Sequence, residues 1–280
     1  MSQKSYDNTP TLYLIPTPIG NLEDITLRSI NIIKYVDILF SEDTRITHEL
    51  LNYLKIKKKC ISSHKYNESA NKEKLLSYLG EGKNVGFVSD RGTPVISDPG
   101  YELAKCAIEN GYNVVGLPGA TALIPALITS GLDSNHFLFY GFLNHKSSKV
   151  RQELNDLKYI DYTIIFYEAP HRIRKTLELM KDTLGNRKIS ISREISKKYE
   201  EIYRGNIDNV LNELTNPKGE FVIIMEGNKE QINYDDISII DHVNLYIKAG
   251  KTSKEAIKLV SKDRGINKSI VYKEYHNIEK

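Results

Sequence analysis

The sequence is poor in cysteine and lacks tryptophan. Its 280 residues include two cysteines, Cys60 and Cys106, which lie far apart and outside any C-x-x-C pair. This excludes a disulfide framework and the usual cysteine-rich zinc patterns, and it predicts a reducing, intracellular compartment. We also expect no metal site, because HExxH is absent and the seven histidines show no i,i+4 pairing.

Long apolar runs are missing as well. No uninterrupted apolar stretch approaches the roughly 20 residues that cross a bilayer. The opening stretch, MSQKSYDNTP, is polar and lacks the apolar segment of a secretory signal peptide. Together these features predict a cytoplasmic protein without membrane segments.

A large excess of one charge is absent, since 39 Lys and Arg face 36 Asp and Glu. Positive charge is concentrated at the end of the chain, where residues 244–273 hold eight basic and two acidic side chains. Thr252 and Glu255 have capping-box spacing, Gly265 suits a helix end, and Asn267 suits the next helix start. This spacing predicts a helix-turn-helix. Such helices are either simply solvated or contact a phosphate backbone.

The rest of the chain alternates short apolar strands with amphipathic helices. Over residues 1–120 each predicted strand is followed by a helix, which indicates an α/β domain with a mainly parallel sheet. Over residues 121–232 several strands follow one another with short links, which favours a second α/β domain with a mixed or antiparallel sheet. A polar link near residues 228–238 then precedes a basic helical segment, residues 233–280.

Four loops at strand ends of the first domain carry unusual residues. Ligands bind beyond the carboxyl ends of strands in parallel α/β sheets. Each loop alone reads as an ordinary turn, but the four together predict a pocket for a small polar ligand. None is a Walker A or GxGxxG loop, and GxSxG is absent, so the usual nucleotide and hydrolase motifs are excluded. The loops are residues 17–21, 41–45, 89–100 and 117–122.

Two further strand ends in the second domain carry charged residues. YEAPHR, residues 167–172, follows a strongly apolar strand, and SRE, residues 192–194, ends another. Glu168 is either a helix cap or a functional acid. Arg193 and Glu194 are either a surface ion pair or part of a site.

These loops together resemble those of the tetrapyrrole-methylase superfamily and, within it, the ribosomal RNA small subunit methyltransferase I family. No single motif is specific, but the combination of TPIGNL, SEDTR, VSDxGTP and YEAPHR is. The basic tail resembles the family's C-terminal helix-turn-helix segment. The matching stretches run in family order from residue 12 to 227: LYLIPTPIGNLEDITLRS, SEDTR, VSDRGTPVISDPGY, LPGATALIPALITSGL, GFL, IFYEAPHR, SRE and KGEFVIIMEG.

The resemblance implies a fold and a reaction. The implied fold is tetrapyrrole-methylase-like: two α/β domains with the donor site in the cleft between them, plus a small C-terminal helix-turn-helix. The implied reaction is methylation of the 2′-hydroxyl of a decoding-region cytidine in small-subunit (16S) rRNA, with S-adenosylmethionine as methyl donor. The acceptor would be the rRNA or the assembled 30S subunit, and the enzyme would be a homodimer.

The resemblance also implies roles for individual residues. Candidates for the base that accepts the hydroxyl proton are Glu168 and His171, then Glu194. Arg193 and Val222 are weaker donor contacts, and Glu42 would face the acceptor. The donor-binding set is Pro18, Ser89, Asp90, Ile96, Thr121, Ala122 and Tyr167. The RNA-binding set is Asp43, Arg45, Arg172, Lys251, Lys254, Lys258 and Lys268, with Lys55, Lys57, Lys58 and Lys59 as further basic residues.

Two positions depart from the family. Arg91 stands where a small residue, commonly Ala, is usual, and it either points to solvent or clamps the donor carboxylate or an RNA phosphate. PGATA replaces PGPSA, which keeps a hydroxyl at Thr121. Other functions also remain open: a methyltransferase of this fold acting on a tetrapyrrole or a modified histidine, a non-catalytic nucleic-acid-binding protein, and a transcriptional regulator.

Overall fold

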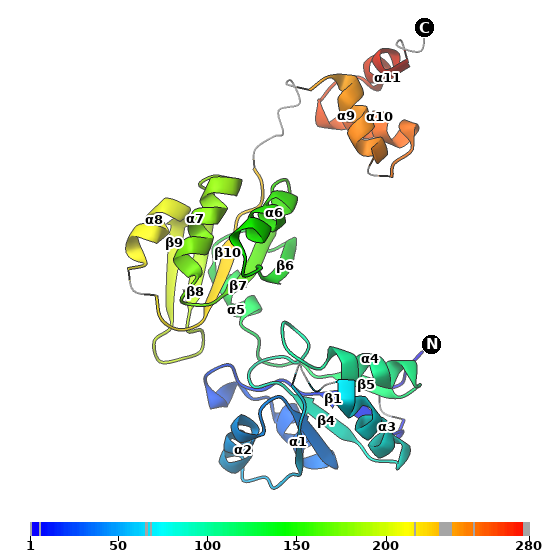
Figure 1. The fold of residues 1–280 in the computed structure, drawn as a ribbon, viewed down its shortest axis with the longest axis vertical. Coiled ribbons are helices and arrows are strands. Elements are labelled where there is room, and N and C mark those ends of the chain that lie inside the picture. The colour runs from blue at the N-terminus through cyan, green and yellow to red at the C-terminus, as the bar shows by residue number, and fades with distance from the viewer. Residues whose placement is uncertain are drawn as a thin grey trace. The chain divides into compact units, whose positions relative to one another are not determined.

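The computed structural model describes residues 2–5, 7–64, 67, 69–215, 217–229, 237–248 and 250–276. The chain forms two compact units, Met1–Gly227 and Asn228–Lys280 (Figure 1). The domain boundary predicted near residue 120 falls inside the first unit, between its two sheets, and the boundary at residue 232 lies outside the described residues. Among the described residues, no helix is long and apolar enough to span a membrane.

The first sheet has five strands in the order β3-β2-β4-β1-β5, and every pairing is parallel. The prediction of a mainly parallel sheet is therefore confirmed. The short strand β3 was not predicted, because its three residues follow a lysine-rich stretch that gives no apolar run. The strands are β1 (Thr11–Leu14), β2 (Ile38–Ser41), β3 (Cys60–Ser62), β4 (Val85–Val88) and β5 (Asn113–Gly116).

Helices cover both faces of this sheet. Helices α1 (Leu27–Tyr35) and α2 (Thr44–Tyr53) bury Ile33 and Leu51 in the core on one face. Helices α3 (Lys72–Gly80) and α4 (Tyr101–Glu109) contribute to the core on the other face, which contains Leu75 and Leu103. Two short 3-10 turns, Leu22–Asp24 and Ser69–Asn71, complete this half. Coverage on both faces explains why β2 and β4 are buried along their whole length.

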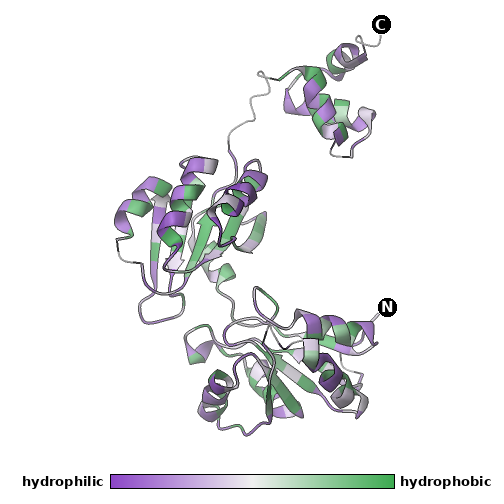
Figure 2. Ribbon diagram, viewed as in Figure 1, coloured by the Kyte–Doolittle hydropathy of each residue, from purple (hydrophilic) through white to green (hydrophobic). Residues whose placement is uncertain are grey.

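The second sheet has the order β6-β7-β10-β8-β9. Strand β6 pairs with β7 in parallel, and the other neighbours pair antiparallel. The predicted mixed sheet is confirmed. Its central strands β7 and β10 are mostly apolar (Figure 2). The five strands are β6 (Phe137–Phe142), β7 (Thr163–Glu168), β8 (Lys188–Arg193), β9 (Glu201–Asn206) and β10 (Phe221–Met225).

Alternate residues of β7 and β10 point to opposite faces, each with its own helices. Phe166 and Ile223 join the larger core with helices α6 (Ser147–Leu157), α7 (Ile173–Leu184) and α8 (Ile207–Glu213). Ile165 and Val222 face the other way, onto helix α5 (Leu123–Thr129). The strand ends next to α5 therefore lie beside the segment that connects the two sheets.

The C-terminal unit has three helices, α9 (Ile239–Lys248), α10 (Ser253–Asp263) and α11 (Lys268–His276). Only a helix pair was predicted, and α9 is the addition. Its Val243 packs into a core with Ile257, Val260 and Val271, so α9 covers the apolar side of the pair. The predicted capping box at Thr252 is present, Gly265 has φ +62°, and Asn267 accepts a hydrogen bond from the Ser269 amide at 3.0 Å.

Removal of the capping box should cause a measurable loss of helix stability. Replacing Thr252 with alanine should destabilise α10 by about 1 kcal/mol, because the side-chain acceptor for the Glu255 amide is lost. Hydrogen exchange of the α10 amides in the full chain measures this, with Ser253→Ala as the neighbouring control. Equal exchange in the two variants would contradict the prediction.

Candidate active site

The loops that follow β1 and β4 are held together by backbone contacts. The Thr17 amide donates to the Gly92 carbonyl at 2.9 Å, and the Gly92 amide donates to the Thr17 carbonyl at 3.0 Å. Gly92 has φ +78°, and a Cβ there would lie 3.2 Å from the Ile19 side chain. The sequence needs glycine at this position, because another residue would be both strained and crowded.

Residues from both sheets line one cavity of about 300 Å³, here called the inter-sheet cavity. Four predicted donor-binding residues lie in its wall: Ile96, Thr121, Ala122 and Tyr167. Val222, a weaker candidate, lies there too. Ile96 comes from the loop after β4, whereas Tyr167 is the penultimate residue of β7, so the wall exists only when the two halves of the unit are assembled.

Tyr167 gives this wall an aromatic surface. Its ring packs edge-on against Phe139 and Phe142, with centroids 5.0 and 5.6 Å away. Burial raises the pKa of Tyr167, while hydrogen bonds with the Thr121 side chain and the Leu123 backbone lower it. The raised pKa keeps the hydroxyl neutral, and its hydrogen bonds with Thr121 and Leu123 hold it beside the start of α5.

The other three predicted donor residues lie elsewhere. Pro18, Ser89 and Asp90 line a second cavity of about 300 Å³ beside helix α2, here called the α2 cavity, together with Thr47. The predicted donor set is thus divided between two cavities. Arg91 lies in the wall of both.

A group of carboxyl side chains lies at the same strand ends. The Asp90 amide donates to Glu42 Oε2 at 3.3 Å, and the Asp43 amide donates to Asp90 Oδ1 at 2.9 Å. Burial raises the pKa of both Glu42 and Asp90. Among the described residues no group of three His, Cys, Asp or Glu side chains has the arrangement of a metal site.

Asp98 is the acid that sequence reasoning did not select. It lines the inter-sheet cavity. Burial, followed by the negative charge of Glu42, raises the pKa of Asp98 to about 7, although a hydrogen bond with Ser89 opposes the rise. In the sequence Asp98 precedes Pro99 and Gly100 and reads as a turn residue, so only the folded environment distinguishes it.

Glu168 is held by the protein itself. The Ala169 amide donates to Oε1 at 2.8 Å, the Thr176 hydroxyl donates to Oε2 at 2.6 Å, and Arg172 Nε lies 3.3 Å from Oε1. Its side chain is 1% exposed. Helix α7 has no side-chain cap bond at its N-cap residue, Arg172, so Glu168 is not its cap. The contacts of Glu168 give it a structural role and argue against the role of general base, because both carboxylate oxygens already accept internal hydrogen bonds.

The Arg172 guanidinium also has internal hydrogen-bond partners. Its guanidinium donates to the Leu143 carbonyl at 3.2 Å and the Asn144 carbonyl at 2.8 Å, and it contacts His145 Nδ1 at 2.7 Å. Arg172 therefore fixes the connection between β6 and α6 instead of being free for a phosphate. His171 is exposed and has no hydrogen bond to another described residue.

Removing the Glu168 carboxylate should destabilise the fold. We expect Glu168→Ala to lower the free energy of unfolding by about 3 kcal/mol, because Arg172 loses a buried partner and Thr176 an acceptor. Urea unfolding measures the loss, and Glu178→Ala on the exposed side of α7 is the control. If the two variants unfolded at the same urea concentration, Glu168 would not have this structural role.

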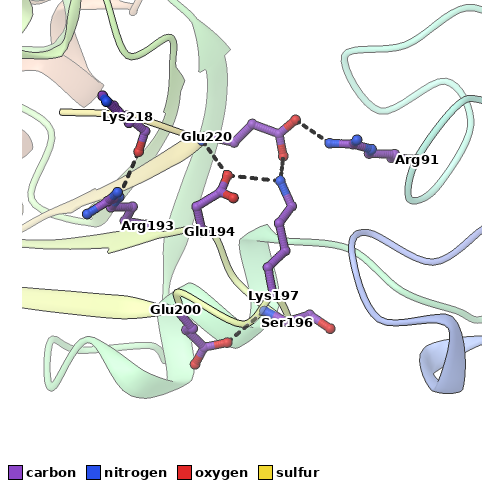
Figure 3. A network of polar contacts seen from close by, with 8 residues as sticks. All are labelled: Arg91, Arg193, Glu194, Ser196, Lys197, Glu200, Lys218 and Glu220. Atoms are coloured by element: carbon purple, nitrogen blue, oxygen red, sulfur yellow. Dashed lines mark hydrogen bonds and ion pairs between the residues drawn. The ribbon is translucent and has the colours of Figure 1, made fainter.

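Glu194 belongs to an ion-pair network that links the two halves of the first unit (Figure 3). Lys197 Nζ lies 2.9 Å from both Glu194 Oε1 and Glu220 Oε2, and Arg91 Nη1 lies 2.8 Å from Glu220 Oε1. Burial raises the pKa of Glu194, but Lys197 and the Glu220 amide outweigh this and leave it lowered. A carboxylate held this way is a weak base.

Arg193 also makes structural contacts. Its Nε donates to the Lys218 carbonyl at 2.6 Å, and its Nη1 lies 3.1 Å from Glu201 Oε2 (Figure 3 shows the Lys218 bond). These bonds join β8 to β9 and to the segment before β10. They leave its side chain directed at the protein instead of a ligand.

The predicted RNA-binding residues fall in both units. Arg45 is exposed and pairs with Asp43 through two carboxylate oxygens, which holds the pKa of Asp43 at about 2. Lys58 donates to the carbonyls of Lys34 and Val36, so its ammonium group supports the fold, and its role in RNA binding stays a prediction. The predicted lysines that are exposed are Lys55, Lys57 and Lys59 in the first unit and Lys251, Lys254, Lys258 and Lys268 in the second.

Comparison with known proteins identifies the family to which this fold belongs. The family of tetrapyrrole (corrin/porphyrin) methylases matches residues 11–211. Ribosomal RNA small subunit methyltransferase I of Halalkalibacterium halodurans is 45% identical over 98% of this chain and 99% of its own length. The protein of the same name from Bacillus subtilis is 44% identical over 99% of this chain and 97% of its own. The chain belongs to the ribosomal RNA small subunit methyltransferase I family.

Solved structures of lower identity agree on the fold. Uroporphyrin III C-methyltransferase from Thermus thermophilus aligns with a TM-score of 0.56 at 16% identity, over 77% of this chain and 97% of that one. A diphthine synthase aligns with a TM-score of 0.59 at 13% identity, over 78% of this chain and 90% of that one. The predicted family and fold class are confirmed.

Membership of the ribosomal RNA small subunit methyltransferase I family also confirms the predicted donor, S-adenosylmethionine. The inter-sheet cavity fits such a molecule. Its apolar wall, formed by Ile96, Ala122 and Tyr167, suits an adenosine ring, and the carboxyl group of Asp98 suits a positively charged centre.

Proposed function

We propose that this chain methylates the ribose 2′-hydroxyl of a cytidine in the decoding region of small-subunit (16S) rRNA, with S-adenosylmethionine as donor. The observation that carries the proposal is the inter-sheet cavity, where predicted donor residues meet Asp98. Two sequence relatives of 44–45% identity are small-subunit rRNA methyltransferases by name. The tetrapyrrole and diphthine neighbours are at most 18% identical and support the fold alone.

The protein's part in the reaction is alignment and proton removal. When bound, S-adenosylmethionine would supply an electrophilic methyl group: its C–S bond would break as the new C–O bond forms, and the sulfonium would become the neutral thioether sulfur of S-adenosylhomocysteine. Ile96, Ala122 and Tyr167 would hold the adenosine part and exclude water from it. The hydroxyl proton has to go to a base, because a neutral ribose hydroxyl is a weak nucleophile.

Asp98 is the base that the geometry favours. It lies in the cavity wall, and its pKa of about 7 matches proton transfer at neutral pH. Glu168 and Glu194 are occupied by internal partners. His171 remains a second candidate, because it is exposed and follows the β7 strand end that lines the cavity.

The C-terminal unit would bind the RNA backbone. Lys251, Lys254, Lys258 and Lys268 are exposed, and Lys contacts to phosphate supply affinity that does not depend on sequence. We extend the proposal to a cytoplasmic homodimer that acts on the rRNA or the assembled 30S subunit.

Methyl transfer from labelled S-adenosylmethionine to purified ribosomal subunits tests the proposal. We expect label in the RNA of small subunits prepared from cells lacking this activity, and little in large subunits. Label confined to large subunits, or none in RNA despite donor binding by calorimetry, would contradict it.

A further inference from the structure

Arg91 holds an unusual position between the two cavities. It follows β4 in the first half of the unit, and its Nη1 reaches 2.8 Å to Oε1 of Glu220, which precedes β10 in the second half (Figure 3). It contributes to the walls of both the inter-sheet cavity and the α2 cavity. Its guanidinium is therefore within reach of a ligand in either cavity.

The charge around Arg91 makes it distinctive. Among the described residues that line the two cavities, Arg91 is the only cation, whereas Glu49, Asp90, Asp98, Glu168 and Glu220 are acids. The nearby Lys197 already pairs with both Glu194 and Glu220 and is only 18% exposed. A negatively charged ligand group in these cavities therefore has one candidate partner among the wall residues.

The ion pair of Arg91 is of the kind that exchanges readily. The Arg91 side chain is 53% exposed and that of Glu220 is 64% exposed, so the pair contributes little stability. One guanidinium nitrogen bonds Glu220, and the planar fork can present two parallel donors to another oxyanion. Glu220 would keep Lys197 as a partner when Arg91 leaves.

We propose that Arg91 is an oxyanion-binding residue that exchanges Glu220 for a carboxylate or phosphate group of a bound substrate. This inference rests on the proposed function, because both substrates of that reaction carry such a group: the carboxylate of the donor and the phosphates of the RNA. Glu220 then acts as an internal competitor that occupies Arg91 while the cavities are empty.

Two substitutions distinguish this role from that of a structural ion pair between the two halves of the unit. Arg91→Ala should weaken binding of the anionic substrate by about tenfold, whereas Glu220→Gln should tighten it by about threefold, because the competitor is removed. In the double variant the gain from Glu220→Gln should vanish, since it acts through Arg91. If the ion pair only holds the two halves together, both single variants should change substrate affinity in the same direction.

Two binding measurements on the full chain distinguish the two sources of the oxyanion, the donor carboxylate and an RNA phosphate. In the first, calorimetry compares S-adenosylhomocysteine with 5′-methylthioadenosine, which lacks the amino-acid carboxylate. A donor carboxylate on Arg91 predicts that Arg91→Ala weakens only the former. In the second, a phosphate on Arg91 predicts weaker binding to purified small subunits and a salt slope reduced by about one.

The proposal is overturned if Arg91→Ala and Glu220→Gln leave both ligands unchanged or shift them in the same direction. Failure of the proposed function looks different, because the unsubstituted chain would then bind S-adenosylhomocysteine without methylating small subunits. Equal melting temperatures of the variants and the unsubstituted chain serve as the folding control.

Discussion

Replacing Asp98 with asparagine is expected to slow methyl transfer to small subunits by about a hundredfold to ten-thousandfold, the range typical of a lost general base. The amide keeps the size of the side chain but cannot accept the hydroxyl proton. Single-turnover rates with saturating donor measure the loss. The rate of the unsubstituted chain should rise with pH up to about 7, the pKa of Asp98, and the pH dependence should disappear in the variant.

His171→Gln is the matched comparison, since His171 is the other unoccupied candidate. If His171→Gln removed the activity and Asp98→Asn did not, the base would be His171 and the assignment to Asp98 would be wrong. Binding of S-adenosylhomocysteine should persist in both variants, which separates a lost base from a lost donor site.

The Asp98→Asn substitution should also stabilise the fold at high pH. The folded chain raises the pKa of Asp98 from 3.8 to about 7, so it binds this proton more tightly than the unfolded chain does. The cost of ionising Asp98 is thus absent below about pH 4, grows up to about pH 7 and is full above it. We expect Asp98→Asn to gain about 1–2 kcal/mol at pH 8, after allowance for solvent screening, and nothing at pH 4. Thermal unfolding at the two pH values checks this, and an equal gain at both would contradict it.

The second large effect concerns the C-terminal unit. Changing Lys251, Lys254, Lys258 and Lys268 to glutamine in the full chain should weaken binding to small subunits by about a hundredfold at physiological salt. It should also reduce the slope of log affinity against log salt, by about one for each lysine that contacts phosphate. Filter binding across a salt series measures both quantities.

The control carries the same change in charge at four exposed lysines of the first unit, Lys105, Lys149, Lys175 and Lys188. A loss confined to the first variant assigns the contact to the C-terminal helices. Equal losses in both variants would mean that net charge alone controls affinity, and an unchanged salt slope would reject the tail as an RNA-binding surface.

The sequence predicts the layered fold well, because each strand is a short apolar run bounded by turn residues and each helix has an apolar face. Two elements escape this reasoning. Strand β3 has three residues after a lysine-rich stretch, and its pairing with β2 decides its conformation. Helix α9 follows a polar link, and its Val243 is buried only by contact with α10 and α11.

The site is less predictable than the fold, because its chemistry depends on residues distant in sequence. In the sequence Asp98 has the pattern of a turn residue. Only in the folded chain do burial and the charges of Glu42 and Asp90 raise its pKa. From the sequence Glu168 is a functional acid or a helix cap, and only the folded structure shows that it accepts hydrogen bonds from Ala169 and Thr176 instead. Arg91 and Glu220 are 129 positions apart, so no local pattern predicts their ion pair.

Identification of the methylated nucleoside tests the central claim most directly. Small subunits labelled by this chain are digested in alkali, where cleavage of the RNA requires a free 2′-hydroxyl. We predict that the label survives in an alkali-resistant dinucleotide whose 5′ residue is 2′-O-methylcytidine. Label released as a base-methylated mononucleotide, or found on another nucleoside, would contradict the account.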